Sequence, residues 1–471
     1  MMGGMAREET RTISRTTSPS PGGAPATGEP PAVEEPRVDA RVPRTSTRAW
    51  TRRLLVVGIV LAALNLRPAI TSLGALLEEV RDGLGMSGTV AGLLTSVPPL
   101  CFAVFGVTAP RLARRFGAGA VVCAGMVAIG AGLLVRPYTH STAGFVAASA
   151  LALMGIAVSN VLMPAIVKRW FPDRVGSMTG LYSMALALGT SIAAAATVPV
   201  TEALGGGWQS GLAIWAGLAA AAVLAWLPLA RERGERATVR RTARGGTPGA
   251  DASAPDPDAS GPDASDPGGS DPGAAGGLRM TRSRTAWALA VFFGLQATAA
   301  YITMGWMAQI FRDAGVAAGA AGLLLAVTMA MGVPLAFVIP RVATRLPHQG
   351  PIVIALGVCG LVGYAGLYFA PAGGALAWAL LLGVSNCAFP LALTMVGMRA
   401  RTGAGVAQLS AFAQSTGYLI SIPGPLLVGV LYQHSGGWGL PLALMAVLMV
   451  PQMAVGVLAG RDRTVEDEAA R

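Results

Sequence analysis

An arginine stands in the middle of a long apolar segment of this chain. The segment runs from Leu54 to Leu77, and Arg67 lies thirteen residues after its first residue and ten before its last. At about 1.5 Å of rise per residue, a helix of this length crosses a bilayer and places the guanidinium near the midplane. An arginine at that depth costs about 2.5–3.5 kcal/mol on insertion scales. The charge therefore needs a partner.

The acidic residues of the chain do not supply that partner. They lie in the N-terminal tail, in a central polar segment, in the C-terminal tail, or within a few residues of a predicted helix end. A charge this costly with no internal counter-ion indicates a partner that comes from outside. The chemistry that fits is an anionic or strongly dipolar substrate.

The neighbours of Arg67 predict a polar, bent midpoint. Pro68 removes the hydrogen bond to the carbonyl of Leu64 and kinks the helix, which a membrane tolerates where neighbours or a cavity satisfy the backbone. Asn65 lies two residues before Arg67, about 200° around a helix, so the two side chains cannot both face one cavity. Both are candidate substrate-binding residues; we favour Arg67 for the substrate and Asn65 for a helix contact.

The composition predicts an all-α membrane protein. Of the 471 residues, 53% are hydrophobic and 13% are charged, whereas a soluble domain has about 25% charged residues. Twelve apolar segments are long enough to cross a bilayer as helices. The predicted spans are residues 53–77, 88–109, 118–136, 143–167, 175–200, 208–230, 285–310, 317–339, 351–371, 373–398, 404–432 and 437–460.

The net charge of +11 reflects topology more than a nucleic-acid partner, which we do not expect. With the N-terminus inside, the loops after the second, fourth, eighth and tenth spans carry ten basic residues, and the opposite loops carry three. This bias predicts both termini on the cytoplasmic side. The strong preference for arginine over lysine indicates GC-rich coding DNA, from which we expect a bacterial plasma-membrane location. The ten are Arg111, Arg114, Arg115, Lys168, Arg169, Arg174, Arg341, Arg345, Arg399 and Arg401, and the three are Arg81, Arg136 and Arg312.

Polar segments divide the chain into two sets of six spans. Residues 1–50 have no apolar targeting core and predict a disordered cytoplasmic tail. Residues 231–283 begin with arginines and continue into an Asp/Pro/Gly/Ser/Ala repeat, which predicts a flexible cytoplasmic linker. We therefore expect six-helix bundles at 51–230 and 284–460, followed by a cytoplasmic tail at 461–471.

The two halves repeat each other in the same order. Ala91–Leu94 (AGLL) recurs at Ala321–Leu324, and at the same 230-residue offset a Pro-Arg-x-Ala-x-Arg sequence at Pro110 recurs at Pro340. Matched motifs on the same membrane side predict a parallel repeat about an axis along the membrane normal. This is the twelve-helix arrangement of the major facilitator superfamily, with the substrate site near the midplane between the halves.

Matched polar positions supply further candidates for substrate binding. Asn160 and Asn386 occupy equivalent places in the fourth and tenth spans, each four residues before a proline. Such amides either join helices or contact the substrate. Gln296 and Tyr301 lie along the seventh span, the counterpart of the first, and are candidates to line the cavity.

The repeat also bears on the alternative, structural role of Arg67, in which the guanidinium is bonded to helix carbonyl oxygens. A parallel repeat that kept such a contact would show a partner in the seventh span, where Thr298 stands instead. We therefore favour the substrate role. Gln414 and Tyr418, one helical turn apart in the eleventh span, form a further candidate polar face.

The basic turns after the second and eighth spans are candidate gating loops. Arg111 and Arg115 follow the second span, and Arg341 and Arg345 follow the eighth. One interpretation makes them inside-facing charges only. The other has them also hold the two halves together in the outward-facing state.

Several function classes are excluded or disfavoured. No mid-membrane acid is available as the usual proton carrier, although tyrosine, arginine or water leaves protons as a candidate coupling ion. The histidines lie in loops and the four cysteines stand singly inside spans, so we expect no metal, disulfide or cofactor. No nucleophile–base–acid set or phosphate loop is present. We expect a monomeric protein that is not an enzyme.

Long ordered segments carry a family resemblance that covers essentially all of residues 53–460. The sequence resembles the cyanate transporter and nitroimidazole transporter family within the major facilitator superfamily. Trp306 is followed by Met-Ala where that family has Leu-Pro, which puts a kink of the seventh span in question. The segments are Asn65–Pro68, Ala91–Gly117, Ser159–Pro172, Thr179–Ser183, Phe389–Arg399 and Leu409–Gly429, with Gln296, Tyr301 and Trp306 in the seventh span.

The resemblance implies secondary transport of a small molecule, with cyanate and nitroimidazole-type compounds as the named substrates. From the residues we favour a small anion bound at Arg67 and moved by alternating access around a cavity lined by spans one, four, seven and ten. One alternative is a drug or nitro-aromatic efflux pump of the same fold, which would need a more aromatic cavity than these Ala/Gly/Leu-rich spans predict. Another is a sensor or scaffold that binds a partner through residues 231–283 or the tails.

Overall fold

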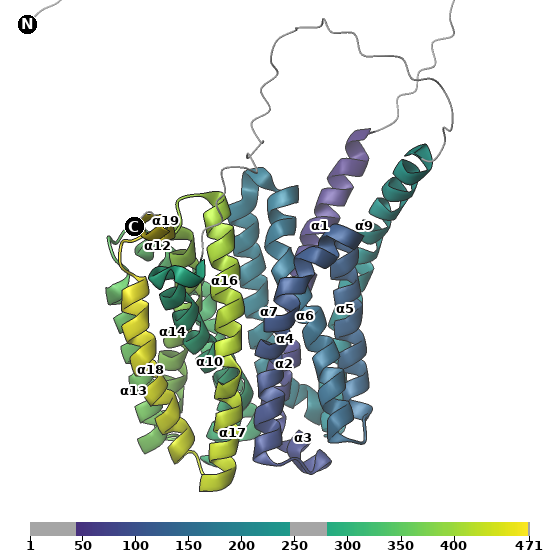
Figure 1. The fold of residues 1–471 in the computed structure, drawn as a ribbon. Coiled ribbons are helices and arrows are strands. Elements are labelled where there is room, and N and C mark those ends of the chain that lie inside the picture. The colour runs from purple at the N-terminus through teal and green to yellow at the C-terminus, as the bar shows by residue number, and fades with distance from the viewer. Residues whose placement is uncertain (1–43, 245–279, 470–471) are drawn as a thin grey trace, which may run out of the picture. The chain divides into compact units, whose positions relative to one another are not determined.

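The computed structural model describes residues 44–244 and 280–469. The contacts below lie among the described residues of one compact unit, which begins at Thr47. In the described residues, twelve helical segments are long and apolar enough to cross a membrane, which confirms the predicted number and approximate positions (Figure 1). They are Arg52–Ala75, Gly88–Phe116, Ala118–Tyr138, Thr142–Trp170, Ser177–Ala203, Trp208–Pro228, Arg284–Asp313, Ala318–Ala343, Gly350–Phe369, Ala375–Met398, Gly405–Ser435 and Gly439–Ala459.

Several spans consist of two helices joined at a break. The helices of the first half are α1 (Arg44–Asn65), α2 (Pro68–Ala75), α3 (Leu77–Leu84), α4 (Gly88–Phe116), α5 (Ala118–Val135), the 3₁₀ helix η1 (Arg136–Tyr138), α6 (Thr142–Trp170), η2 (Pro172–Arg174), α7 (Val175–Ala203), α8 (Trp208–Ala213) and α9 (Trp215–Arg244). Those of the second half are η3 (Met280–Arg282), α10 (Arg284–Asp313), α11 (Ala318–Ala330), α12 (Gly332–Ala343), α13 (Gly350–Phe369), α14 (Ala375–Asn386), α15 (Ala388–Met398), α16 (Gly403–Ser421), α17 (Pro423–Ser435), α18 (Gly439–Ala459) and α19 (Val465–Ala469).

Prolines account for two of the breaks. In the first span α1 ends at Asn65 and α2 begins at Pro68, which confirms the predicted kink. In the eleventh span α17 begins at Pro423 in the same way. Helix α10, which carries Met-Ala after Trp306, contains no proline and runs unbroken along the seventh span.

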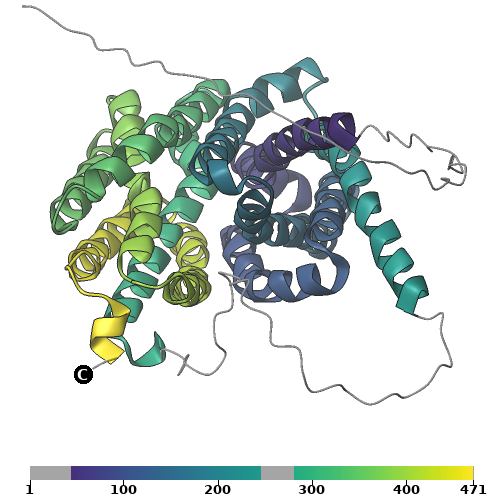
Figure 2. The ribbon, with the colours of Figure 1, turned by 90° about the horizontal axis from the view of Figure 1, so that it is seen from above.

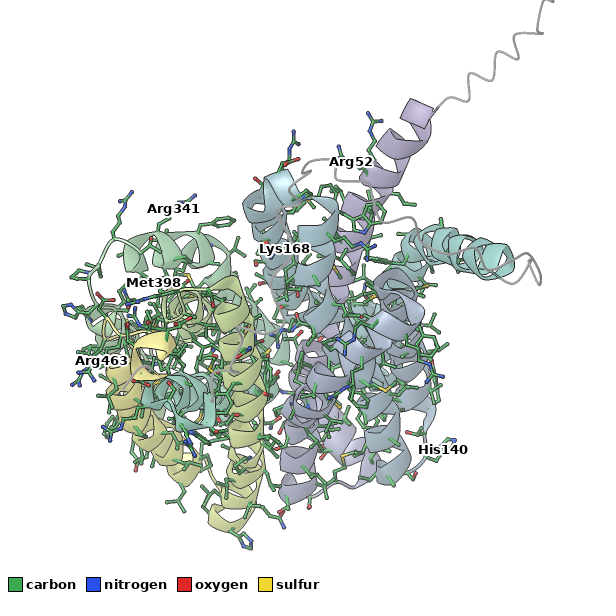
Figure 3. All side chains as sticks on the ribbon, turned by 45° about the horizontal axis from the view of Figure 1, so that its top comes forward. Arg52, His140, Lys168, Arg341, Met398 and Arg463 are labelled. Carbon is green, nitrogen blue, oxygen red and sulfur yellow. The ribbon has the colours of Figure 1, made fainter. Side chains whose placement is uncertain are left out.

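The two ends of the spans can be identified by the residues that lie there. Arg52, Lys168 and Arg341 lie at one end of the spans and His140 lies at the other (Figure 3). We name these ends the tail-side face and the far face. Seen from above, the helices of the first six spans gather on one side and those of the last six on the other (Figure 2).

The first and the last helix of the first half, α1 and α9, are longer than the sequence predicted. Helix α1 begins at Arg44 and α9 continues to Arg244, so residues 44–50 and 231–244 are helical where we expected tail and linker. Arginine is a good helix former, and basic residues at a helix C-terminus are favoured by the helix dipole. The rest of the predicted N-terminal tail and of the linker lies outside the described residues.

Glycines fix how closely the two halves approach near the far face. A Cβ on Gly74 of α2 would collide with the backbone carbonyl of Met304 on α10, and one on Gly429 of α17 would collide with that of Gly88 on α4. Small residues of this kind allow membrane helices to pack backbone against backbone. These contacts set the position of the first span against the seventh and of the second against the eleventh.

A short C-terminal helix, α19, is hydrogen-bonded to the start of α10 at the tail-side face. Glu468 on α19 accepts hydrogen bonds from the hydroxyls of Ser283 and Thr285, at 2.6 and 2.7 Å, and from the backbone N–H of Thr285 at 3.2 Å. The carboxylate therefore sits at the N-terminus of α10, where the helix dipole favours negative charge. Partial burial raises the pKa of Glu468, but these hydrogen bonds outweigh it and hold the pKa below its ordinary value.

We predict that Glu468→Gln destabilises the protein at pH 7 by about 1 kcal/mol, as expected for hydrogen bonds to a carboxylate. Because the folded-state pKa lies below the ordinary 4.5, this stabilisation is present above that pH and is lost as the pH falls through the folded-state pKa. Thermal unfolding in detergent from pH 7 down to pH 3 measures the gap between variant and wild type. Asp173→Asn, at an exposed carboxylate on the same tail-side face, is the control. A gap that stays constant with pH would contradict the assignment.

Candidate functional site

The backbone of Arg67 is fixed at the break between α1 and α2. Arg67 is the N-cap residue of α2, and its carbonyl accepts hydrogen bonds from the N–H groups of Ile70 and Thr71 at 2.9 and 3.1 Å. The carbonyl of Leu64, which Pro68 leaves without its usual donor, packs against α7 at Gly189, where a Cβ would collide with it. Arg67 therefore lies between two helices and not inside one, while its backbone carbonyl remains hydrogen-bonded.

Three tyrosines from three other spans interact electrostatically with the half-buried guanidinium of Arg67. It is within hydrogen-bonding reach of the Tyr301 hydroxyl on α10. It also acts electrostatically on Tyr182 of α7 and on Tyr418 of α16, whose hydroxyl is hydrogen-bonded with that of Tyr301. In the part of the chain described here, Arg67 forms no ion pair and no side-chain hydrogen bond to a carbonyl oxygen. Among the described residues, the polar groups found to interact with this positive charge are tyrosine hydroxyls.

An aromatic cluster adjoins the tyrosines. The ring of Tyr418 stacks on Phe102 of α4 with centroids 5.0 Å apart and meets Phe293 of α10 edge-on at 5.1 Å. Phe293 in turn contacts Phe389 of α15 at 5.8 Å, and Tyr301 lies 6.5 Å from Tyr418. Our expectation of a site poor in aromatic residues was therefore wrong, because the few aromatic residues of the spans converge at one place.

The two asparagines of the first half are held in different ways. Asn65 is buried, and its amide donates to the carbonyls of Leu61 at 2.8 Å and of Leu218 at 3.0 Å. It joins the first span to the sixth, which agrees with the helix contact that we favoured over substrate binding. Asn160 accepts a hydrogen bond from the hydroxyl of Tyr182 and so reaches the Arg67 site through that tyrosine.

Gln296 and Asn386, predicted to join Arg67, lie elsewhere. Both line a small separate cavity among the helices of the second half, together with Thr303, Tyr364, Ser385 and Gln452. The reason is geometric: Gln296 and Tyr301 are five residues apart on one helix, about 140° around its axis, so they cannot face the same way. The predicted set of substrate-binding residues therefore divides, with Arg67, Tyr301 and Asn160 in one group and Gln296 and Asn386 in another.

The four candidate gating arginines are exposed on the tail-side face. Arg111 donates to the carbonyl of Val107 on its own helix at 3.5 Å, and Arg341 donates to that of Phe337 at 3.2 Å. The guanidinium of Arg115 lies over the ring of Phe116. These contacts stay within single helices, so the gating role of Arg111, Arg115, Arg341 and Arg345 remains a prediction.

The far face is closed by polar contacts between the halves, which we did not predict. Arg312 at the end of α10 pairs with Glu78 at 2.8 Å and with Glu79 at 2.9 Å, both on α3. Nearby, the side chain of Gln433 on α17 accepts hydrogen bonds from the N–H and hydroxyl of Thr89 on α4 at 2.8 and 2.7 Å. The sequence showed two acids and an arginine at matched span ends but could not show that those ends meet.

Comparison with known proteins identifies the family. Residues 55–422 match the model of the Major Facilitator Superfamily. The chain belongs to this superfamily. It is therefore a multi-pass membrane transporter and not an enzyme, as the sequence predicted.

Relatives from bacteria extend along nearly the whole chain. An uncharacterized transporter, YycB, of Bacillus subtilis is 32% identical over 413 residues, which cover 87% of this chain and 94% of that protein. The 2-nitroimidazole transporter of Escherichia coli is 30% identical over 89% and 99% of the two chains. The cyanate transport protein CynX of Escherichia coli is 28% identical over 85% and 96%. These matches confirm the resemblance that the sequence motifs carried.

Solved structures confirm the fold. A D-xylose–proton symporter superposes with a TM-score of 0.63 at 12% identity, covering 87% of this chain and 96% of its own. The nucleoside transporter NupG gives 0.62 at 14% identity, with 86% and 98% covered. At such identities the similarity concerns the arrangement of helices alone.

We predict that Glu78→Gln combined with Glu79→Gln loosens the far face. Exposed ion pairs contribute about 0.2–1 kcal/mol each. Loss of both should therefore raise the population of the state with an open far face a few-fold. A cysteine placed at Leu73, a buried residue in the far-face half of the first span, would report this as a few-fold faster reaction with a membrane-impermeant thiol reagent. Glu202→Gln, an exposed acid at the far end of α7, is the matched control. Equal rates in wild type and double variant would rule out a gating role.

Proposed function

We propose that this protein is a secondary transporter of a compact anion, cyanate-like in size and charge, with Arg67 as the electrostatic anchor. The observation that supports this most directly is the environment of Arg67. Its half-buried guanidinium lies deep in a span, within hydrogen-bonding reach of the Tyr301 hydroxyl and under the electrostatic influence of Tyr182 and Tyr418, and it pairs with no carboxylate of the described residues. The relative named a cyanate transport protein supports the same substrate class.

The electrostatics favour an anion over a cation or a neutral polar compound. Tyrosine hydroxyls can donate hydrogen bonds to an anion as well as accept from a guanidinium, so an anion at Arg67 would gain charge-assisted hydrogen bonds on more than one side. In this low-dielectric region the attraction is much stronger than in water. The bound anion also neutralises a charge that is costly to keep in the membrane.

Alternating access provides the transport cycle. We propose that two six-helix bundles, residues 51–230 and 284–460, rock about the central site, as in other carriers built from repeats. The far-face contacts of Arg312 with Glu78 and Glu79 would break when that end opens. The arginines of the tail-side turns would then hold the opposite end closed. The basic loops favour a cytoplasmic location for the tail-side face, and protons remain a candidate coupling ion.

Arg67→Gln should reduce uptake of labelled cyanate into proteoliposomes at least about tenfold, because hydrogen bonds to charged groups contribute about 1.5–3 kcal/mol. The amount of protein in the membrane and its melting temperature should not fall, since the variant removes an unpaired charge from the bilayer. Arg461→Gln, on the exposed tail-side surface, should transport at the wild-type rate. Wild-type cyanate transport in Arg67→Gln would refute the anchor role.

The aromatic cluster favours a second candidate function. A nitro-heteroaromatic compound could place its nitro oxygens at Arg67 and stack its ring on Phe102 or Tyr418, whose rings already face each other at 5.0 Å. The relative named a 2-nitroimidazole transporter agrees with this substrate class. Membership of a transporter family favours either substrate over the sensor or scaffold hypothesis.

Phe102→Leu separates the two substrate classes. Loss of one ring contact should weaken binding of 2-nitroimidazole several-fold, as stacking contributes about 0.5–1.5 kcal/mol, while cyanate binding should change little. Displacement of labelled cyanate from purified protein measures both affinities. Phe171→Leu, at the tail-side end of α6 and outside the cluster, controls for loss of a ring as such. Equal losses for both compounds would mean that the cluster only supports the fold.

A further inference from the structure

A second arginine is buried inside the helical assembly, at Arg136. The sequence assigned it to a loop on the far side, but it is 1% exposed and belongs to the third span. Its guanidinium donates to the carbonyl of Ala69 at 2.9 Å and to the hydroxyl of Ser72 at 3.3 Å, and lies 6.0 Å from the ring centroid of Phe145. No carboxylate among the described residues pairs with it.

The structure contains a useful contrast in Arg399, which is also 1% exposed. Arg399 donates to the carbonyls of Ala459 and Gly460 and to the side chain of Gln349, and lies 3.9 Å from Asp462. Its hydrogen bonds and its charge are both satisfied within the chain, as expected of a structural arginine. Arg136 differs, because its Nε has no hydrogen-bond partner and its charge has no counter-ion in the described structure.

Arg136 opens onto a cavity that contains a second unpartnered donor. The hydroxyl of Ser149 on α6 is 1% exposed and has no hydrogen-bond partner, and both residues line the same cavity. The cavity has a volume of about 20 Å³, which exceeds the space that one water molecule needs. The apolar walls include Leu73, Leu94 and Leu153, and a ligand bound there would lose its hydration shell.

The cavity lies between Arg67 and the far face. It is lined by Ala69, Ile70, Leu73 and Gly74, which follow Arg67 along the first span toward that face. Leu73 is six positions after Arg67 in the sequence, which corresponds to about 9 Å along a helix axis. Tyr301, which contacts Arg67, also lines the cavity. One tyrosine therefore forms a wall shared by the two arginine environments.

We infer that this cavity is a second binding subsite for a compact monovalent anion, with the Nε–H of Arg136 and the hydroxyl of Ser149 as donors. An uncompensated buried guanidinium and an unpaired buried hydroxyl each cost free energy that an anion between them would remove. The subsite lies on the route between the far face and Arg67, where it would hold the anion before or after the central site. This inference rests on the proposed function for the sign of the substrate's charge.

Ser149→Ala tests the subsite without disturbing the hydrogen bonds that Arg136 gives to Ala69 and Ser72. Equilibrium binding of labelled cyanate to purified full-length protein should show two sites in wild type. In Ser149→Ala one of them should weaken about tenfold, while the melting temperature is unchanged or higher because an unsatisfied hydroxyl is lost. Ser96→Ala, at a buried serine outside the cavity whose hydroxyl donates to the carbonyl of Gly92, should bind as wild type.

The Arg67→Gln background separates this inference from the proposed function. That variant should keep one cyanate site, and Arg67→Gln combined with Ser149→Ala should weaken the remaining site about tenfold. If Arg67→Gln keeps two sites, the anchor role of Arg67 fails while the subsite is still judged by Ser149→Ala. If Arg67→Gln binds no cyanate, or if Ser149→Ala leaves both affinities of the wild type unchanged, the second subsite does not exist.

Discussion

A positive charge that the spans do not neutralise is the constraint from which the organisation of this transporter follows. A carboxylate beside Arg67 would stabilise the empty protein, but it would also compete with any anionic substrate for the guanidinium. The hydroxyls of Tyr301, Tyr182 and Tyr418 offset part of the cost, and that of Tyr301, which is within reach of the guanidinium, can also donate to a ligand. The break at Pro68 is needed for the same reason, because it frees the side chain from a regular helix without loosening the backbone.

The sequence predicts the spans and the local backbone well, and it predicts the site only in part. Hydropathy and Pro68 act within one helix, so their consequences can be derived from one stretch of chain. The separation of Gln296 from Tyr301 could also have been derived, since helical geometry alone puts them about 140° apart. The meeting of Phe102, Tyr182 and Tyr418 could not. It depends on how far helices slide and rotate against each other, which close contacts such as Gly74 against Met304 decide.

The arginines show why charge counting and structure give different information. The positive-inside rule predicts the topology from the loops in which basic residues stand. Arg136 and Arg399 were both counted as loop charges for that prediction. In the structure both side chains are buried, and they differ in what surrounds them. Arg399 has acceptors from three residues, whereas Arg136 keeps an unbonded Nε beside a cavity. The local supply of acceptors, and not the loop, separates a structural arginine from one that is available to a ligand.

The weakness of the far-face closure suits a carrier that must reverse. The pairs of Arg312 with Glu78 and Glu79 are partly exposed, so they contribute about 0.2–1 kcal/mol each, whereas leaving one partner of a buried pair unpaired costs about 3–5 kcal/mol. A ligand shifts a conformational equilibrium only by its difference in affinity for the two states, and a shift from 1:99 to 99:1 already requires about 5.5 kcal/mol. A buried, fully bonded contact at this end would exceed what one small ligand can supply. Partly exposed ion pairs keep the two states close enough in free energy for substrate binding to shift the equilibrium between them.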